Sequence, residues 1–153
     1  MTMFARLGNK PSLVIGRAGM DLYADPPGTR IEAATRFTAA LGGSSANIAV
    51  AMVRAGAKAA LMTCVSEDAV GRFCLGQLDA YGVDRTYVRT IGGEARNSLA
   101  VVESRLENCQ SVIYRNGAAD FSMTNEDAEA VDYSRFSALI ATGTVLAAER
   151  SRN

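Results

Sequence analysis

The sequence predicts an α/β fold in which short buried strands alternate with amphipathic helices. Three brief apolar runs, at residues 12–18, 59–65 and 137–145, are bounded by polar residues or glycine, as buried strands usually are. Apolar residues recur at helical spacing between the first two runs, at residues 48–55, and after the second, at residues 68–81. This order favours a mostly parallel sheet that is flanked by helices and built from right-handed crossovers.

Asp21 follows the first predicted strand, residues 12–18, and is the first candidate for a ligand-binding residue. Open parallel sheets bind their ligands at the carboxyl ends of strands, and Asp21 is predicted at or just past such an end. The alternative interpretation is that Asp21 only completes a turn. We therefore expect a carboxylate at the carboxyl edge of the sheet.

A Leu-Gly-Gly-Ser-Ser-Ala-Asn stretch precedes the first helix, and the rest of the chain is organised around it. Gly42 and Gly43 permit a tight turn and let a ligand approach the main chain without meeting a Cβ atom. Ser44 or Ser45 is expected to cap the helix, whose amides and dipole favour a polar ligand beside Asn47 in the first turn. The plainer alternative is a connection that binds nothing.

Both helices have predicted ends. The first should bury one apolar stripe that includes Ile48, Met52 and Ala55, and Gly56 follows in the position where helices commonly stop. The second should open at Asp68, because aspartate is a favoured N-cap, and should close at a glycine.

A β-hairpin is predicted in the second half of the chain. Residues 97–105 and 110–115 alternate polar and apolar side chains around a short connection, which is typical of two strands with one apolar face. Residues 36–41 are predicted as a further strand that leads to the glycine pair. The hairpin is expected to project from the main sheet or to cover a site.

The last part of the chain contains one more helix signal and an incomplete element. Thr124 with Asp127 has the spacing of a capping box and predicts a short helix over residues 125–131. Residues 146–153 resemble the start of another helix, and the predicted strands and helices would close poorly as a complete fold. We therefore expect the chain to be part of a longer protein.

The composition excludes several classes of function. Lysine plus arginine equal aspartate plus glutamate at 16 each, so nucleic acid and membrane surfaces are not expected partners. No apolar run is long enough to span a membrane and no secretory signal is evident, which favours the cytoplasm. The chain has no histidine and three widely spaced cysteines, which excludes Ser-His and Cys-His catalysis and argues against a zinc site.

Together these motifs resemble the N-terminal half of the ribokinase and PfkB-type sugar kinases. The pieces keep the family's order and spacing over nearly the whole chain, although Ser66 stands where the family commonly has glycine. The resemblance implies a ribokinase-like fold with a small β-lid from residues 22–41 and 84–116, so that residues 1–153 would be the N-terminal portion of a kinase domain. The matching positions are residues 16–21, Gly42, Gly43, Asn47, Gly56, Asp68 and Gly71.

The resemblance implies transfer of a phosphoryl group from ATP to a sugar hydroxyl. Asp21 and Asn47 would hold acceptor hydroxyls, and the amides around Gly42 and Gly43 would lie close to the sugar. The hairpin and the segment after it look most like kinases of the sugar acids 5-dehydro-2-deoxygluconate and 2-keto-3-deoxygluconate. Arg115 would supply the cation for the carboxylate of such an acid, unless it is only a solvated charge at a strand end.

The family's catalytic motif, Asp-Thr-x-Gly-Ala-Gly-Asp, does not occur in this sequence. The nearest candidate, Ala-Thr-Gly-Thr at residues 141–144, lacks the aspartates. The family implies ATP and Mg²⁺, whose binding site would lie largely outside this chain. We therefore expect the chain to hold the sugar-binding half of a site, without the catalytic base, and to be inactive alone.

Three other functions compete with this interpretation. One is a non-catalytic module that binds a sugar or forms a homodimer through the lid. A second is a ribokinase- or fructokinase-type activity on a neutral sugar. A dinucleotide-binding oxidoreductase is disfavoured, because residues 16–19 read Gly-Arg-Ala-Gly and lack the GxGxxG fingerprint.

Overall fold

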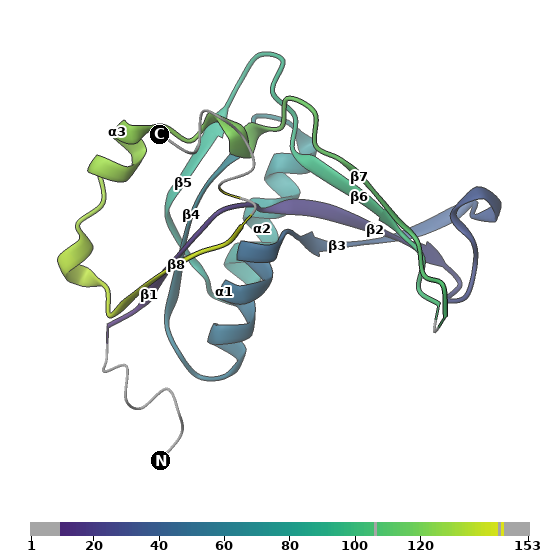
Figure 1. Ribbon diagram of the computed structural model, residues 1–153, viewed down its shortest axis with the longest axis horizontal. Helices are drawn as coiled ribbons and strands as arrows, with labels where there is room; N and C mark the ends of the chain where they lie inside the picture. The colour runs from purple at the N-terminus through teal and green to yellow at the C-terminus, as the bar shows by residue number, and fades with distance from the viewer. Residues whose placement is uncertain (1–9, 106, 144, 146–153) are drawn as a thin grey trace.

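The computed structural model describes residues 10–105, 107–143 and 145. Within these residues two four-stranded sheets adjoin, and the second extends away from the first as an arm (Figure 1). No helix in this part of the chain is long and apolar enough to cross a membrane. The helix expected from residue 146 onward lies outside the described residues.

The central sheet is parallel throughout and has the strand order β5-β4-β1-β8, which confirms the predicted α/β fold. Its strands are β1 (Ser12–Ile15), β4 (Ala59–Ser66), β5 (Asp84–Ile91) and β8 (Ala138–Ala141). The apolar strand β4 is buried along its whole length, because it has a strand on either side and a core on each face. β8 is an outer strand with alternating exposure, so the expectation of a third fully buried strand is wrong there.

Two helices, α1 (Ser44–Arg54) and α2 (Ala69–Tyr81), cover one face of the central sheet. The core between them and the sheet contains Val14, Leu61 and Leu78, which have no exposed surface. Burial of each such side chain contributes about 1.5–3 kcal/mol. This face therefore holds both helices in a fixed position relative to the strand ends.

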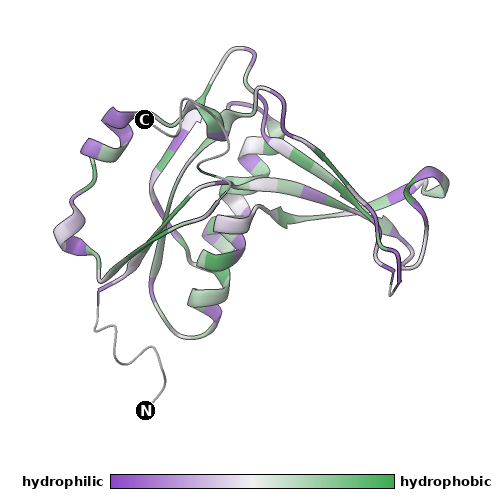
Figure 2. Ribbon diagram, in the orientation of Figure 1, coloured by the Kyte–Doolittle hydropathy of each residue, from purple (hydrophilic) through white to green (hydrophobic). Residues whose placement is uncertain are grey.

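Shorter elements cover the opposite face. These are η3 (Ala119–Ser122) and α3 (Asn125–Glu129), and η4 (Tyr133–Arg135) leads from α3 to β8. The predicted capping box between Thr124 and Asp127 is confirmed at the start of α3. α3 is hydrophilic, whereas β1 and β8 carry hydrophobic residues (Figure 2), so α3 contributes little to the core. The buried residues beneath these elements are Leu13, Ala60, Met62, Cys64, Met123 and Val131.

The second sheet, which we call the arm sheet, has the strand order β3-β2-β6-β7. Its strands are β2 (Gly19–Asp25), β3 (Arg36–Gly42), β6 (Ser98–Val102) and β7 (Ser111–Tyr114), and η2 (Ile31–Ala33) lies between β2 and β3. β2 pairs antiparallel with β3 and parallel with β6. The antiparallel pairing of β6 with β7 confirms the predicted hairpin.

Two expectations about the strands are wrong. β1 ends at Ile15 and the chain turns at Gly16 with a φ of 141°, so Asp21 lies inside β2 and not at the end of the first strand. Residues 84–91 form β5 in the central sheet, so the segment predicted as 84–116 contributes to the arm only after β5. β5 is an outer strand with no fully buried residue, so it lacks the continuous apolar run that identifies a buried parallel strand, which explains the second error.

α1 begins without a side-chain cap, so the prediction that Ser44 or Ser45 caps it is wrong. Its N-cap is Gly43, whose φ of 97° is easily adopted only by glycine. Ser45 Oγ instead donates to the carbonyl oxygen of Ile15 at 3.1 Å, which fixes the start of the helix to the end of β1. At the other end Ala55 lies outside the helix and is exposed, and the predicted glycine follows it.

A network of side chains at the start of α2 joins the two sheets. Asp68 Oδ1 is the predicted cap and accepts from the amides of Val70 at 2.9 Å and Gly71 at 3.0 Å. Ser66 Oγ donates to the same oxygen at 2.7 Å. Asn97, just before β6, accepts from the Ser66 amide at 2.6 Å and donates its own amide to Ser66 Oγ at 3.1 Å. The serine that departs from the family pattern therefore links the base of the arm to α2.

Replacing Asp68 with alanine is expected to lower the free energy of unfolding by about 1 kcal/mol, because two helix amides lose their acceptor. Burial raises the pKa of Asp68, but its hydrogen bonds to Gly71, Ser66 and Val70 bring that pKa below its ordinary value of 3.8. The charged carboxylate therefore stabilises the fold at neutral pH, and this contribution is lost as the pH falls from 3.8 through the lowered pKa.

The measurement is denaturant unfolding at neutral and acidic pH. Asp68→Asn is the matched control, because asparagine keeps a capping oxygen but does not titrate. It should lose less stability than Asp68→Ala at neutral pH and should lack the acid-dependent loss. An alanine variant as stable as the parent at neutral pH would contradict the capping role.

Candidate functional site

Asp21 lies between two alanines in a row of residues that crosses the arm sheet. The backbone register places it opposite Ala40 in β3 and opposite Ala100 in β6, and Ala100 lies opposite Ile113 in β7. Residues opposite each other share one face of a sheet. Both neighbours of Asp21 in the adjoining strands are alanines, so no large side chain stands beside the carboxylate in these two strands.

The Asp21 carboxylate lies directly against Gly42. A Cβ atom at residue 42 would collide with both carboxylate oxygens, so any larger residue would displace the Asp21 side chain from this position. Asp21 Oδ1 is buried and has no hydrogen-bond partner among the described residues. Burial raises the pKa of Asp21, and the positive charge of Arg17 opposes that rise. A buried acceptor without a partner is costly, and a binding role of the Asp21 carboxylate would account for a fold that keeps it.

Asn47 lies at the junction of β3 and α1, where the glycine pair is also found. Its amide donates to the Gly43 carbonyl oxygen at 2.9 Å, which places its exposed side chain in the first turn of the helix. The carbonyl of Arg17 lies against this turn and accepts from the Ala46 amide at 3.2 Å. Asp21 and Asn47 therefore belong to one region of the molecule, and their contact with a ligand stays a prediction.

Two residues beside Asp21 were not predicted from the sequence as site residues. Arg17 lies in the connection between β1 and β2, and its Nη1 atom donates to Ser98 Oγ at 3.1 Å. Both side chains are buried. Arg17 is a cation between Gly16 and Gly19, in the segment that leads to Asp21. This pattern is the sequence signal that could have identified it.

Arg115 is already paired with a carboxylate. Its guanidinium forms an ion pair with Asp120 in η3 and lies over the ring of Phe121, 4.3 Å from the ring centroid. The pair is largely shielded from solvent, with 17% of the Arg115 side chain exposed and 2% of the Asp120 side chain. The contact expected between Arg115 and a sugar acid stays a prediction. In that contact the guanidinium of Arg115 would bind the acid while it also pairs with Asp120.

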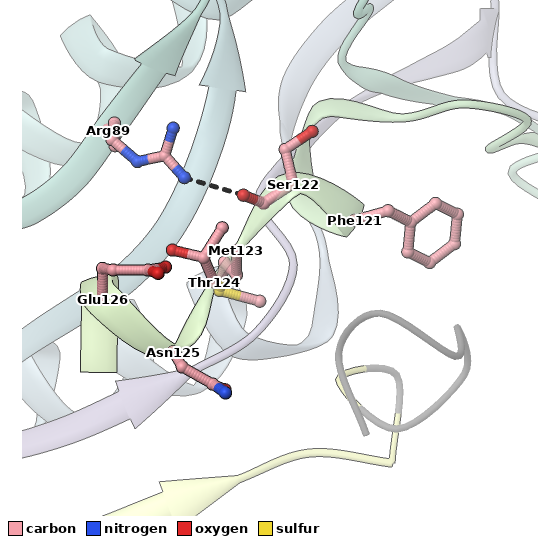
Figure 3. A pocket seen from close by; sticks show the side chains of 7 residues that line it. All are labelled: Arg89, Phe121, Ser122, Met123, Thr124, Asn125 and Glu126. Atoms are coloured by element: carbon pink, nitrogen blue, oxygen red, sulfur yellow. Dashed lines mark hydrogen bonds between the residues drawn. The ribbon is translucent and has the colours of Figure 1, made fainter. Parts of the chain in front are cut away.

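A surface hollow of about 480 Å³ lies between β5 and the segment from η3 to α3 (Figure 3). Arg89 is the cation in this hollow and donates to the Ser122 carbonyl oxygen at 2.7 Å. It also makes two hydrogen bonds of 2.6 Å to the carboxylate of Asp127, so its charge is balanced within the protein. The ring of Phe121 points away from Arg89 (Figure 3).

A second hollow, of about 460 Å³, lies beside the hairpin of the arm sheet. Arg96 and Asn97 line it from the base of β6, and Tyr114 lines it from β7. Its lining does not include Asp21 or Asn47, and the same is true of the hollow beside Arg89. The predicted site near the β3–α1 junction is therefore separate from these two hollows.

The described residues do not fit the metal and nucleotide that the family resemblance implies. They include no group of three or more cysteine, aspartate or glutamate side chains arranged to hold a metal ion. The catalytic motif with its paired aspartates is absent from the sequence. We therefore assign no metal-dependent or nucleotide-dependent step to this part of the chain.

Solved structures of sugar kinases share this fold. Fructokinase from Xylella fastidiosa superposes with a TM-score of 0.80 and 24% identity, covering 94% of this chain and 44% of that chain. The 2-dehydro-3-deoxygluconokinase from Thermotoga maritima gives a TM-score of 0.70 at 24% identity, covering 77% of this chain and 36% of that chain. The parallel sheet with its arm is thus a partial ribokinase-like α/β fold.

The sequence profile of the pfkB family carbohydrate kinases matches residues 10–150, and the chain belongs to this family. The 5-dehydro-2-deoxygluconokinase from Photobacterium profundum is 34% identical to it over 154 residues, covering 99% of this chain and 46% of that protein. The chain thus spans less than half the length of this curated relative.

Proposed function

We propose that the protein containing this chain is a sugar kinase that phosphorylates a sugar acid, and that residues 1–153 supply the sugar-binding portion of its site. The observation that carries this proposal is the buried Oδ1 atom of Asp21, which lies against Gly42 and lacks a partner among the described residues. Membership of the pfkB family supports phosphoryl transfer to a sugar hydroxyl. The names of the relatives support 5-dehydro-2-deoxygluconate or 2-dehydro-3-deoxygluconate as the substrate.

In this proposal the chain's own residues hold and orient the acceptor sugar. Asp21 accepts a hydrogen bond from a sugar hydroxyl, and Asn47 contributes an amide at the start of α1. Gly42 leaves the space that the Asp21 carboxylate occupies, and Gly43 leaves the space for the carbonyl of Arg17, so the glycine pair positions Asp21 and the connection before it. Phosphoryl transfer depends mainly on positioning and on exclusion of water, so these contacts and the cover of the arm sheet would determine rate and specificity.

ATP is the proposed phosphoryl donor, with Mg²⁺ as the expected metal ion. We place their site, together with the catalytic base, in the part of the protein outside this chain. The proposal extends to a cytoplasmic location, where ATP is available. It also treats residues 22–42 and 98–114 as the lid of the kinase, because the strands of the arm sheet lie there.

The full-length protein is expected to release ADP from ATP when 5-dehydro-2-deoxygluconate is supplied. The rate should be at least about tenfold higher than with fructose, because a hydrogen bond to a charged group changes an affinity or a rate by about tenfold or more. A coupled spectrophotometric assay of ADP measures both rates, with 2-dehydro-3-deoxygluconate as a second acid. Release of no ADP above background with any of the three would contradict the kinase proposal. Equal rates with fructose would contradict the preference for an acid.

A sugar-binding module that dimerises through the arm is the second candidate. β7 is an outer strand of the arm sheet, and its Val112, Ile113 and Tyr114 are 44%, 54% and 61% exposed. An outer strand with exposed apolar side chains is suited to pairing with another strand. Such a module would bind the sugar acid in isothermal titration calorimetry without consuming ATP, so the ADP assay separates the two candidates.

A further inference from the structure

Arg17 is a buried cation that forms no ion pair with any described residue. It is 9% exposed and lies in the connection between β1 and β2. Nη1 donates to Ser98 Oγ at 3.1 Å, and Ser98 has no exposed surface. Within the described part of the chain, the guanidinium therefore has a neutral partner but no carboxylate in contact.

The guanidinium lies on the face of the arm sheet that carries Asp21. Gly19 pairs with Ser98 in β6, and the next residue of β2 on the same face is Asp21. A Cβ atom at Gly19 would lie 2.6 Å from Ser98 Oγ and 3.5 Å from Arg17 Nη1, so the guanidinium occupies the space above this glycine. Arg17 also lowers the pKa of Asp21 against the effect of burial, which fits a short distance between the two charges.

The charge of Arg17 is therefore available to a ligand. Burial of a cation is costly unless an anion and hydrogen-bond acceptors compensate it. Ser98 supplies one neutral acceptor, and no ion pair joins Arg17 to Asp21 in the described part of the chain, although the charge of Arg17 lowers the pKa of Asp21. A guanidinium presents several N–H groups in a planar fork that matches a carboxylate.

We propose that Arg17 binds the carboxylate of the sugar acid while Asp21 binds one of its hydroxyls, which makes Arg17 the residue that selects acids over neutral sugars. This assignment rests on the proposed function and deepens it. It differs from the expectation for Arg115, whose guanidinium is already occupied by Asp120. Ser98 is a positioning residue, because it touches Arg17 and holds its guanidinium over Gly19.

The test is isothermal titration of the full-length protein, without ATP, with 5-dehydro-2-deoxygluconate and with fructose. Arg17→Gln is expected to raise the Kd for the acid about 10- to 100-fold and to change the Kd for fructose by less than about twofold, because only the acid has a charged partner for Arg17. Arg17→Lys keeps the charge but not the fork, and Ser98→Ala keeps the guanidinium but not its orientation. Both should raise the acid Kd by less than Arg17→Gln does.

Arg54→Gln is the matched control, because Arg54 is exposed at the far end of α1 and stacks on Tyr81, 4.9 Å from the ring centroid. It should leave both Kd values unchanged, and thermal melting of each variant shows that it is folded. The proposal is overturned if Arg17→Gln leaves the acid Kd unchanged or raises both Kd values equally. It is equally overturned if Arg115→Gln removes the preference for the acid while Arg17→Gln does not.

Failure of the proposed function gives a different result from failure of the Arg17 assignment. If the parent protein binds the acid and Arg17→Gln abolishes that binding, but no ADP is formed, the Arg17 assignment stands and the kinase proposal falls. If ADP is formed and the parent binds acid and fructose equally, the kinase stands and the Arg17 assignment falls. A parent protein that binds no acid overturns the assignment directly.

Discussion

Asp21→Asn is expected to lower kcat/KM for the sugar by about 10- to 100-fold in the full-length kinase, because a hydrogen bond to a charged group contributes about 1.5–3 kcal/mol. The asparagine side chain has the same shape but carries no charge and presents one acceptor oxygen instead of two. The Oδ1 atom of Asp21 is buried without a partner among the described residues, so this oxygen adds no hydrogen bond to the stability of the fold. The KM for ATP should change little, because Asp21 is proposed to contact only the sugar.

The stability of this variant distinguishes a binding role from a structural one. Burial raises the pKa of Asp21, so the charged form is disfavoured in the folded state and its removal should leave the melting temperature unchanged or raise it. Asp25→Asn is the control in the same strand, since Asp25 forms an exposed ion pair with Arg36 at 3.4 Å and such pairs contribute little. The proposed contact would be refuted if Asp21→Asn had the same kcat/KM as the parent. It would also be refuted if the variant lost activity only because it was unfolded at the assay temperature.

Gly71→Ala is expected to lower the free energy of unfolding by about 1–3 kcal/mol, the usual effect of forcing an extra methyl group into packed structure. Alanine normally stabilises a helix relative to glycine by about 0.8–1.0 kcal/mol, so the expected sign is reversed at this position. The reason is that a Cβ atom at residue 71 would overlap the carbonyl oxygen of Ser66 in the adjoining strand β4. A backbone atom of a buried strand cannot move aside as a flexible side chain can.

Gly76 provides a matched control within the same helix. It is exposed, and nothing lies within 4 Å of the position that its Cβ atom would occupy. Gly76→Ala should therefore stabilise the protein by about 0.5–1 kcal/mol. Denaturant midpoints of the two variants and the parent give both values. A Gly71→Ala variant as stable as Gly76→Ala would show that α2 does not pack against Ser66 as described.

Features that depend on neighbours in the sequence could be predicted from it. Asp68 caps α2 and Gly82 ends it with a φ of 74°, because a cap and a left-handed residue are properties of a few consecutive positions. The hairpin and the capping box of α3 follow for the same reason. The resemblance to a known family added the overall arrangement, which local patterns alone would not have given.

Features that depend on distant contacts could not be predicted in this way. Ser44 and Ser45 have the composition of caps, but their hydroxyls bind Thr142 after β8, and Ser45 also binds Ile15. β2 was missed because its pairing with β3 and β6 arises only when the arm assembles. The contact of Arg17 with Ser98 could not be predicted for a related reason, since the two residues are 81 positions apart in the sequence.

The close packing of Asp21 on Gly42 also limits how this lineage can diverge. Any replacement at residue 42 inserts a carbon atom where the carboxylate stands, so it would displace Asp21 from its place in the proposed site unless residue 21 changes as well. Residues 21 and 42 are therefore expected to covary among related sequences. In a newly sequenced paralogue, loss of the glycine alone would therefore predict loss of the proposed contact between residue 21 and a sugar.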